Sequence, residues 1–204
     1  VVQVLVPSFE RPIKEHLPKV KTVVIGNAIP QYEEQANLAT KKDHYKIIFV
    51  GRLAKGHKRP HLLIEAFAGL AKDFPNWTVE LWGAVDGKAY YKELQMMISK
   101  NKLENQVFLK GTTNDVPAVL KNCDIFAITS AYEGFSLALG EAMSMGLPCV
   151  AFRSCESISG MVENEVTGVL CDDGAAAYKE GLRELMINQE KRIEIGQQAR
   201  EAMR

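Results

Sequence analysis

Two carboxylate residues, Glu133 and Glu141, flank the segment Gly-Phe-Ser-Leu-Ala-Leu-Gly. The apolar run 123–129 before them predicts a buried strand, and the residues after Glu133 predict a helix that begins near Gly134. A strand-to-helix turn leaves backbone N–H groups free, and the helix dipole there favours an anion such as a diphosphate. These free groups would be those of Phe135, Ser136 and Leu137.

On such a helix the two carboxylates would be up to ~12 Å apart, roughly the span from the hexose hydroxyls to the ribose hydroxyls of a nucleotide sugar. Ionised carboxylates are acceptor-only groups that suit hydroxyl ligands. The spacing therefore predicts a sugar-nucleotide site. The alternative is that both glutamates decorate a surface helix.

The composition of this predicted helix favours the site. Its apolar residues lie on almost all sides, so the helix is predicted to be buried, and a polar Glu141 inside it needs a reason. Gly140 is also unusual, because an interior glycine costs about 1 kcal/mol relative to alanine and marks a close approach of another segment. The apolar positions are Phe135, Leu137, Ala138, Leu139, Ala142, Met143 and Met145.

A second candidate for chemistry is the basic loop 51–58, which follows the apolar run 46–50. The planar guanidinium of Arg52 can grip phosphate oxygens, and Lys58 can add a mobile point charge. The alternative is a solvated basic loop. Neither the Walker motif nor G-x-G-x-x-G occurs in the chain, which argues against a P-loop enzyme and a dinucleotide oxidoreductase.

Composition sets the outer bounds of the interpretation. The chain has 204 residues, of which 47% are hydrophobic, and its formal net charge is +0, so no basic excess indicates a nucleic-acid partner. No apolar run approaches the ~18 residues of a membrane span, and no signal peptide is recognisable at the start. The four cysteines lack C-x-x-C spacing, which favours small buried thiols in a reducing compartment over a metal site or disulfides.

Short apolar runs alternate with helical patterns along most of the chain. The runs that predict strands are 46–50, 77–82, 106–109, 124–128, 148–152 and 167–171. The helical patterns lie at 60–73, 88–100, 115–121, 134–145, 157–163, 174–187 and 188–204. This alternation predicts an α/β fold, a doubly wound parallel sheet of the Rossmann-like type. Ligands of such sheets bind at the carboxyl ends of the strands, so the loops 51–58, 83–87, 110–114 and 129–136 are expected to share one rim.

The first 45 residues differ from this pattern. Residues 1–6 and 22–25 read as strands, Pro7-Ser8 reads as a helix start with Ser8 as its N-cap, and residues 30–45 are polar without periodicity. Since two strands and one helix cannot bury a core, we expect residues 1–45 to be the tail of a missing N-terminal domain plus a linker, and 46–204 to be a separate domain that carries the predicted sugar-nucleotide site. The alternative for 1–29 is an edge hairpin of the following domain.

The residues discussed above resemble the retaining glycosyltransferases of the GT-B fold, family 4, also called the group 1 glycosyl transferases. The resemblance covers about residues 20–187, and its most specific part is the combination of the E-x7-E motif with the Gly-Arg…Lys loop. The matching segments are 24–30, Gly51-Arg-Leu53, Lys58, 62–67, Gly83, Phe108, Gly111, 131–136, 141–143, 146–148 and 166–170.

The resemblance implies the donor half of a GT-B enzyme, with Gly51 at the start of the phosphate loop. Arg52 and Lys58 would neutralise the diphosphate and the charge that grows on it, Glu133 would hold sugar hydroxyls, and Glu141 the ribose. The base would lie against the loop around Leu109, Lys110 and Gly111. No metal or other cofactor is implied, and Asp172-Asp173 reads as a turn rather than a D-x-D motif.

Three departures qualify the resemblance. The basic loop is one residue longer than usual, so Lys55 competes with Lys58 for the phosphate role. The segment 154–160 replaces a common Gly-Gly-x-Pro-Glu turn. The histidine that the family usually places near the sugar belongs to the acceptor-side domain, and His57 is at most a phosphate neighbour.

The resemblance implies a retaining glycosyltransferase that transfers a hexose from a nucleotide-diphosphate sugar, with a UDP-sugar as the expected donor and a glycan or lipid-linked acceptor as partner. We expect this enzyme to be cytoplasmic, with peripheral association at the cytosolic face of a membrane, and we expect the isolated chain to be inactive. The alternatives are a sugar-nucleotide binding module without catalysis and another GT-B enzyme, an epimerase or a phosphorylase.

Overall fold

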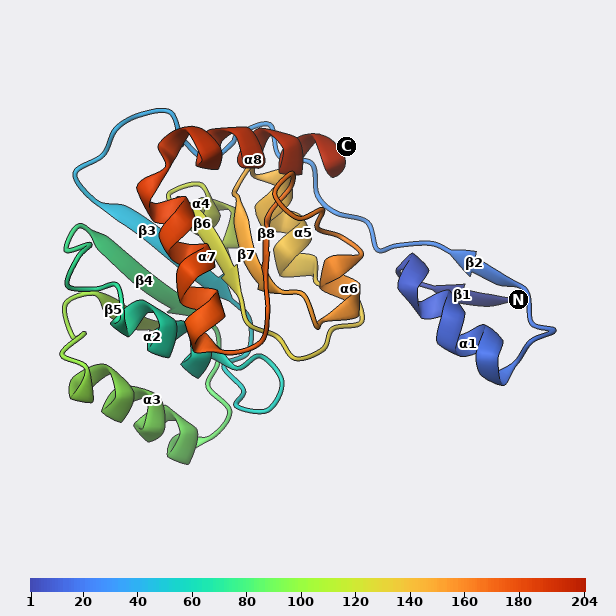
Figure 1. Ribbon diagram of the computed structural model, residues 1–204, viewed down its shortest axis with the longest axis horizontal. Coiled ribbons are helices and arrows are strands. Elements are labelled where there is room, and N and C mark those ends of the chain that lie inside the picture. Colours follow the sequence, from blue (N-terminus) through green and yellow to red (C-terminus); the bar gives the residue numbers. More distant parts are fainter.

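Six parallel strands form the central sheet, in the order β5-β4-β3-β6-β7-β8 (Figure 1). The computed structural model describes all 204 residues. The strands are β3 (Tyr45–Val50), β4 (Trp77–Trp82), β5 (Val107–Gly111), β6 (Ile125–Ile128), β7 (Cys149–Phe152) and β8 (Val169–Cys171). The predicted doubly wound α/β fold is confirmed.

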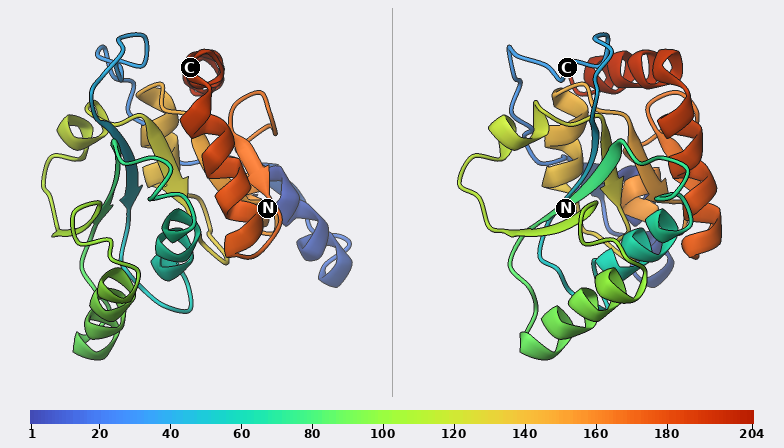
Figure 2. Two further views of the ribbon diagram at one scale, coloured as in Figure 1. Left: turned by 60° about the vertical axis from the view of Figure 1, so that its left-hand side comes forward. Right: turned by 90° about the vertical axis from the view of Figure 1, so that its left-hand side faces the viewer.

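Helices cover both faces of the sheet, because successive strand side chains point to opposite faces and both sets are apolar. In β3, for example, Ile47 and Phe49 belong to one hydrophobic cluster and Ile48 to the other. The first face carries α2 (Pro60–Ala68), α3 (Lys88–Lys100) and α7 (Ala175–Ile187), and the second carries α4 (Val116–Leu120), α5 (Leu137–Ser144) and α6 (Glu156–Ser159). The last helix, α8 (Gln189–Ala202), contributes to both clusters. Figure 2 shows it as the red helix at the top of both views.

The strand order places a topological switch point between β3 and β6. From β3 the chain builds β4 and β5 to one side and then returns to build β6, β7 and β8 on the other. The loops that leave the carboxyl ends of β3 and β6 therefore diverge to opposite faces of the sheet. A crevice at such a point is where open α/β sheets bind their ligands.

Several predicted boundaries were wrong by a few residues. Helix α2 ends at Ala68, not at residue 73, because Gly69 follows it. Helix α6 is a single turn, Glu156–Ser159, where residues 157–163 were predicted. The most consequential shift is that α5 begins at Leu137 rather than near Gly134.

The N-terminal residues form a small separate unit of β1 (Val2–Val4), the 3₁₀ turn η1 (Pro7–Phe9), α1 (Glu10–His16) and β2 (Thr22–Val24). Because β1 pairs with β2 in parallel and in a sheet of its own, the edge-hairpin alternative is wrong. The N-cap prediction is also wrong: Val6 occupies the cap of η1, and the buried Oγ of Ser8 has no hydrogen-bond partner. Figure 1 shows this unit beside the main domain, joined to β3 by a long segment that passes α8.

None of the helices combines the length and the apolar composition that a membrane-spanning helix needs.

Candidate functional site

The loops at the carboxyl ends of β3, β4 and β5 are joined by backbone hydrogen bonds. The N–H of Gly51 donates to the carbonyl of Trp82 (2.9 Å), and the N–H of Gly83 donates to the carbonyl of Gly111 (2.7 Å). A Cβ on Gly83 would lie 2.0 Å from the carbonyl oxygen of Gly51, so only glycine permits this approach. These contacts confirm that the loops share one rim.

Lys58 and Glu133 form an ion pair across the switch point. The Nζ of Lys58 contacts Oε1 of Glu133, and the Oγ of Ser130 donates to the same oxygen at 2.6 Å. Both side chains of the pair are largely buried. The ion pair thus joins Lys58 of the basic loop to Glu133 of the E-x7-E segment, two motifs that were predicted separately.

The backbone around this pair is held by polar side chains that the sequence reasoning did not single out. The Oγ1 of Thr129 donates to the carbonyl of Lys58 (2.7 Å), and the Nε of Arg59 donates to the carbonyl of Thr129 (2.9 Å). Arg59 also reaches Ser130 and Asp173. Arg59 has a left-handed backbone (φ 49). The cationic composition of the loop was the only sequence signal for its role.

His57 stacks on Tyr132 beside the pair, with ring centroids 4.2 Å apart and planes at 9°. A ring nitrogen of His57, Nε2, lies 2.7 Å from the carbonyl of Tyr132, so this nitrogen carries the proton and donates. The N–H of Ala131 donates to the carbonyl of His57 (2.8 Å). His57 is therefore an ordered part of the rim.

The structure separates the two lysines of the basic loop. Lys55 pairs with Glu93 of α3 at 2.7 Å, whereas Lys58 faces Glu133. Lys58 therefore lies at the switch point between β3 and β6, whereas Lys55 lies at α3. The side chain of Arg52 is exposed and forms no hydrogen bond or ion pair within the protein, so its five N–H donors are free.

The N-terminus of α5 also has free donors. Ser136 is its N-cap, and the Oγ of Ser136 accepts from the N–H of Leu139 (3.4 Å). No protein acceptor meets the N–H groups of Phe135, Ser136, Leu137 or Ala138. The later helix start adds Ala138 to the predicted set, because the free donors of a helix belong to its first turn.

Glu141 lies in the middle of α5 and forms no ion pair or side-chain hydrogen bond. Burial raises the pKa of its carboxyl group. A half-buried carboxylate without a donor is costly, because no hydrogen bond offsets the loss of water. The surface-helix alternative does not fit this environment.

The predicted base site involves β5, which runs two residues beyond the predicted end at 109 and includes Lys110 and Gly111. The Nζ of Lys110 lies over the ring of Trp82, 5.4 Å from the centroid. Leu109 is partly buried at the edge of the core. No three His, Cys, Asp or Glu side chains group to hold a metal ion, and the expected absence of a metal stays a prediction.

Comparison with known proteins identifies the family of the chain. A sequence profile described as "Glycosyl transferases group 1" matches residues 30–202. A Haemophilus influenzae protein described as an uncharacterized glycosyltransferase is 28% identical over 178 residues, which cover 87% of this chain and 49% of that protein. An Escherichia coli UDP-Gal:alpha-D-GlcNAc-diphosphoundecaprenol alpha-1,3-galactosyltransferase is 31% identical over 140 residues (66% of this chain, 34% of the relative). The chain thus spans about half or less of these curated relatives.

Solved structures with the same fold support this family assignment. Staphylococcus aureus TarM, in a complex with fondaparinux, alpha-GlcNAc-glycerol and UDP, superposes with a TM-score of 0.87 and 25% identity over 99% of this chain and 40% of TarM. Anabaena HepE, solved with UDP and glucose, has a TM-score of 0.81 at 24% identity, over 100% of this chain and 58% of HepE, and supports the fold. The chain belongs to the group 1 glycosyl transferases, with the fold of the GT-B enzymes.

Proposed function

We propose that the chain is the donor-binding part of a retaining hexosyltransferase that uses a nucleotide-diphosphate sugar, with UDP as its nucleotide. The observation that carries this proposal is the meeting of Lys58, Glu133 and the free N–H groups of α5 at the switch point. A phosphate needs the cations and N–H donors, and a sugar needs the carboxylate. UDP occurs in the TarM complex and in the name of the Escherichia coli relative.

In the proposed complex the diphosphate lies between Arg52, Lys58 and the N-terminus of α5. Lys58 has three N–H donors, of which Glu133 occupies one, so two remain for phosphate oxygens. As the glycosidic bond breaks, negative charge grows on the departing diphosphate, and the two cations stabilise it more in the transition state than in the ground state. Glu133 accepts from sugar hydroxyls, and Glu141 accepts from the ribose.

We further propose that residues 1–45 belong to the acceptor-side part of a longer enzyme and its linker, and that the acceptor is a glycan or a lipid-linked glycan. The acceptors in the relatives' names include a diphosphoundecaprenol-linked sugar and poly(glycerol phosphate). Such acceptors fit a cytoplasmic enzyme that associates with a membrane surface. The isolated chain is then expected to bind the donor without efficient transfer.

Nucleotide titration tests the proposal. Isothermal calorimetry with UDP, GDP and ADP should show preferential binding of UDP, and Arg52→Ala or Lys58→Ala should each weaken it by about 1.5–3 kcal/mol, roughly ten- to 150-fold, while the fold stays intact. Lys55→Ala is the matched control, because Lys55 pairs with Glu93 away from the crevice. No binding of any nucleoside diphosphate, or an equal loss in the Lys55 variant, would remove the proposal.

A transfer assay separates the enzyme from a binding module. The full-length enzyme with a UDP-sugar should release UDP and form a product with the anomeric configuration of the donor. Inversion at the anomeric carbon would contradict the retaining assignment, and tight donor binding without any turnover would favour the binding module.

A further inference from the structure

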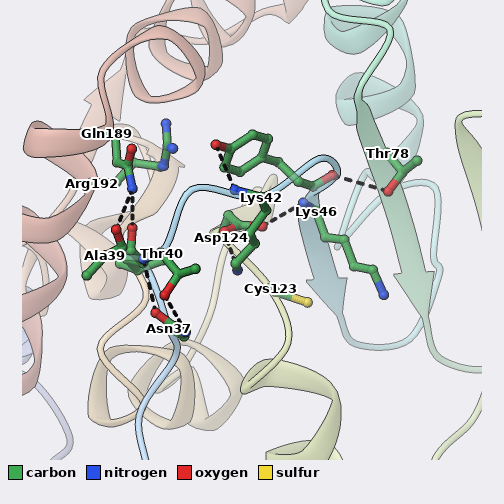
Figure 3. Close-up of polar contacts among 12 residues, drawn as sticks. Asn37, Ala39, Thr40, Lys42, Lys46, Thr78, Cys123, Asp124, Gln189 and Arg192 are labelled. Atoms are coloured by element: carbon green, nitrogen blue, oxygen red, sulfur yellow. Dashed lines mark hydrogen bonds and ion pairs between the residues drawn. The ribbon is translucent and has the colours of Figure 1, made fainter.

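Residues 29–42, which we call the strap, contain no helix or strand but are tied to the main domain along their length. In the second half, the Nε2 of Gln189 donates to the carbonyls of Leu38 (2.8 Å) and Ala39 (3.0 Å). The Nζ of Lys42 pairs with the buried Asp124 at 2.7 Å (Figure 3). The sequence reasoning took this segment for a simple linker because it is polar and aperiodic.

Arg200 of α8 holds the middle of the strap. Its Nη2 donates to the carbonyl of Tyr32 (2.5 Å) and lies 3.4 Å from that of Glu33, while its Nη1 donates to the carbonyl of Glu34 (3.1 Å). Nη1 also donates to the carbonyl of Ser144, the last residue of α5 (2.9 Å). A lysine could not serve all four carbonyls, because this arrangement uses the planar fork of the guanidinium.

The first residues of the strap cross α5 next to Glu141. The side chain of Ile29 fills the place where Gly140 lacks a Cβ, since a Cβ there would lie 2.4 Å from Cδ1 of Ile29. One turn later on the same side of the helix, the Oγ of Ser144 donates to the carbonyl of Pro30 (2.6 Å). The close approach that the interior glycine predicted is therefore made by the strap.

Ile29 and Pro30 contact α5 at Gly140 and Ser144, one residue before Glu141 and three residues after it, so the strap lies beside this carboxylate. Burial, and after it the charge of Glu141, raises the pKa of the Tyr32 hydroxyl. Burial is also the cause of the raised pKa of Glu141, which has no charged partner. The strap thus lies next to a half-buried carboxylate that has no hydrogen-bond partner within the protein.

We propose that Arg200 is a positioning residue for the nucleotide site, because it holds the strap against α5 at Gly140 and Ser144, on either side of Glu141, and so makes the strap a wall of the ribose site. This inference rests on the proposed function for the identity of the ligand. A hydrogen bond from ribose to Glu141 is stronger in a pocket that water does not enter. When Arg200 is removed, residues 32–34 of the strap lose their hydrogen bonds to α8, whereas Gln189 still holds Leu38 and Ala39, and water then reaches Glu141.

The test compares Arg200→Ala, Arg200→Lys and the control Lys191→Ala. Lys191 is also on α8 and pairs with Glu165 and Glu184, so its loss perturbs the helix without touching the strap. Carboxyl-detected NMR titration reports the pKa of Glu141 in the free protein, and calorimetry reports UDP affinity. In Arg200→Ala we expect the Glu141 pKa to fall towards its ordinary value and UDP to bind about tenfold more weakly. Arg200→Lys should be intermediate, and Lys191→Ala should match the wild type in both.

An unchanged Glu141 pKa in a folded Arg200→Ala protein would overturn the inference, and so would an equal loss in Lys191→Ala. If Arg200→Ala does not fold, Arg200→Lys decides by the same two readouts. The two readouts can also disagree. If the wild-type protein binds no UDP, the proposed nucleotide function is wrong, but a fall in the Glu141 pKa in Arg200→Ala would still uphold the role of Arg200 in covering Glu141.

Discussion

Glu133→Gln should separate the binding of the nucleotide from the binding of the sugar. In the free protein the Glu133 side chain is 8% exposed and that of Lys58 19%, so their pair is shielded from water. The substitution keeps the shape of the side chain but removes the negative charge that occupies Lys58. The ammonium is then free for the diphosphate alone, and free UDP should bind as well as before or more tightly.

The opposite is expected for the intact donor. A UDP-sugar loses a charge-assisted acceptor for its hydroxyls, and such a hydrogen bond contributes about 1.5–3 kcal/mol. The ratio of the dissociation constants of UDP and the UDP-sugar should therefore change by about tenfold or more in favour of UDP. Because two donors, Lys58 and Ser130, lose a charged acceptor, the folded protein should also lose about 1–3 kcal/mol of stability.

Calorimetric titrations of wild type and variant with both ligands measure this ratio directly. Ser130→Ala is the matched control, since it removes a hydrogen bond to the same carboxylate oxygen but keeps the charge. Equal weakening of both ligands by Glu133→Gln would refute the assignment of Glu133 to the sugar. A loss of UDP affinity alone would show that the ion pair with Lys58 supports phosphate binding.

Three further predictions use the free protein. Since burial raises the pKa of Glu141 in the folded state, the ionisation of Glu141 opposes folding at neutral pH, and Glu141→Gln should raise Tm at pH 7. This gain in Tm should vanish as the pH falls through the raised pKa towards 4.5, and thermal melts at a series of pH values measure it. Gly140→Ala should cost about 1–3 kcal/mol in urea unfolding through its clash with Ile29, and a double-mutant cycle with Ile29→Ala should show a smaller cost than the sum of the single variants. Burial raises the pKa values of Cys123 and Cys149 to about 12, so neither thiol should react with a disulfide reagent at pH 8 until urea unfolds the chain; rapid labelling of the native protein would contradict the buried placement.

Local patterns were sufficient to predict the fold class. The period of apolar residues is a property of neighbouring positions, so it marks strands such as 46–50 and helices such as 88–100 without knowledge of the rest of the chain. The alternation of these elements then implies parallel strands with helical crossovers. For the same reason the rim of loops was predictable, and hydrogen bonds between Gly51, Trp82, Gly83 and Gly111 confirm it.

The pairings within the site depend on segments that are distant in sequence. Lys55 and Lys58 are equivalent as sequence, and only the arrangement of β3 beside β6 brings Lys58 to Glu133 and leaves Lys55 beside Glu93. The start of α5 shifted because Ser136, and not an earlier residue, caps the helix.

The strap was not predictable as an ordered element, because the contacts of Arg200 and Gln189 that hold its middle go to its backbone carbonyl groups. Arg200 binds backbone carbonyl groups of the strap and of α5. Every residue type has the same carbonyl group, so no pattern of side chains in the sequence predicts these contacts. Periodicity reports which face of an element is buried, whereas a guanidinium that gathers carbonyls from two segments acts only after the chain has brought them together.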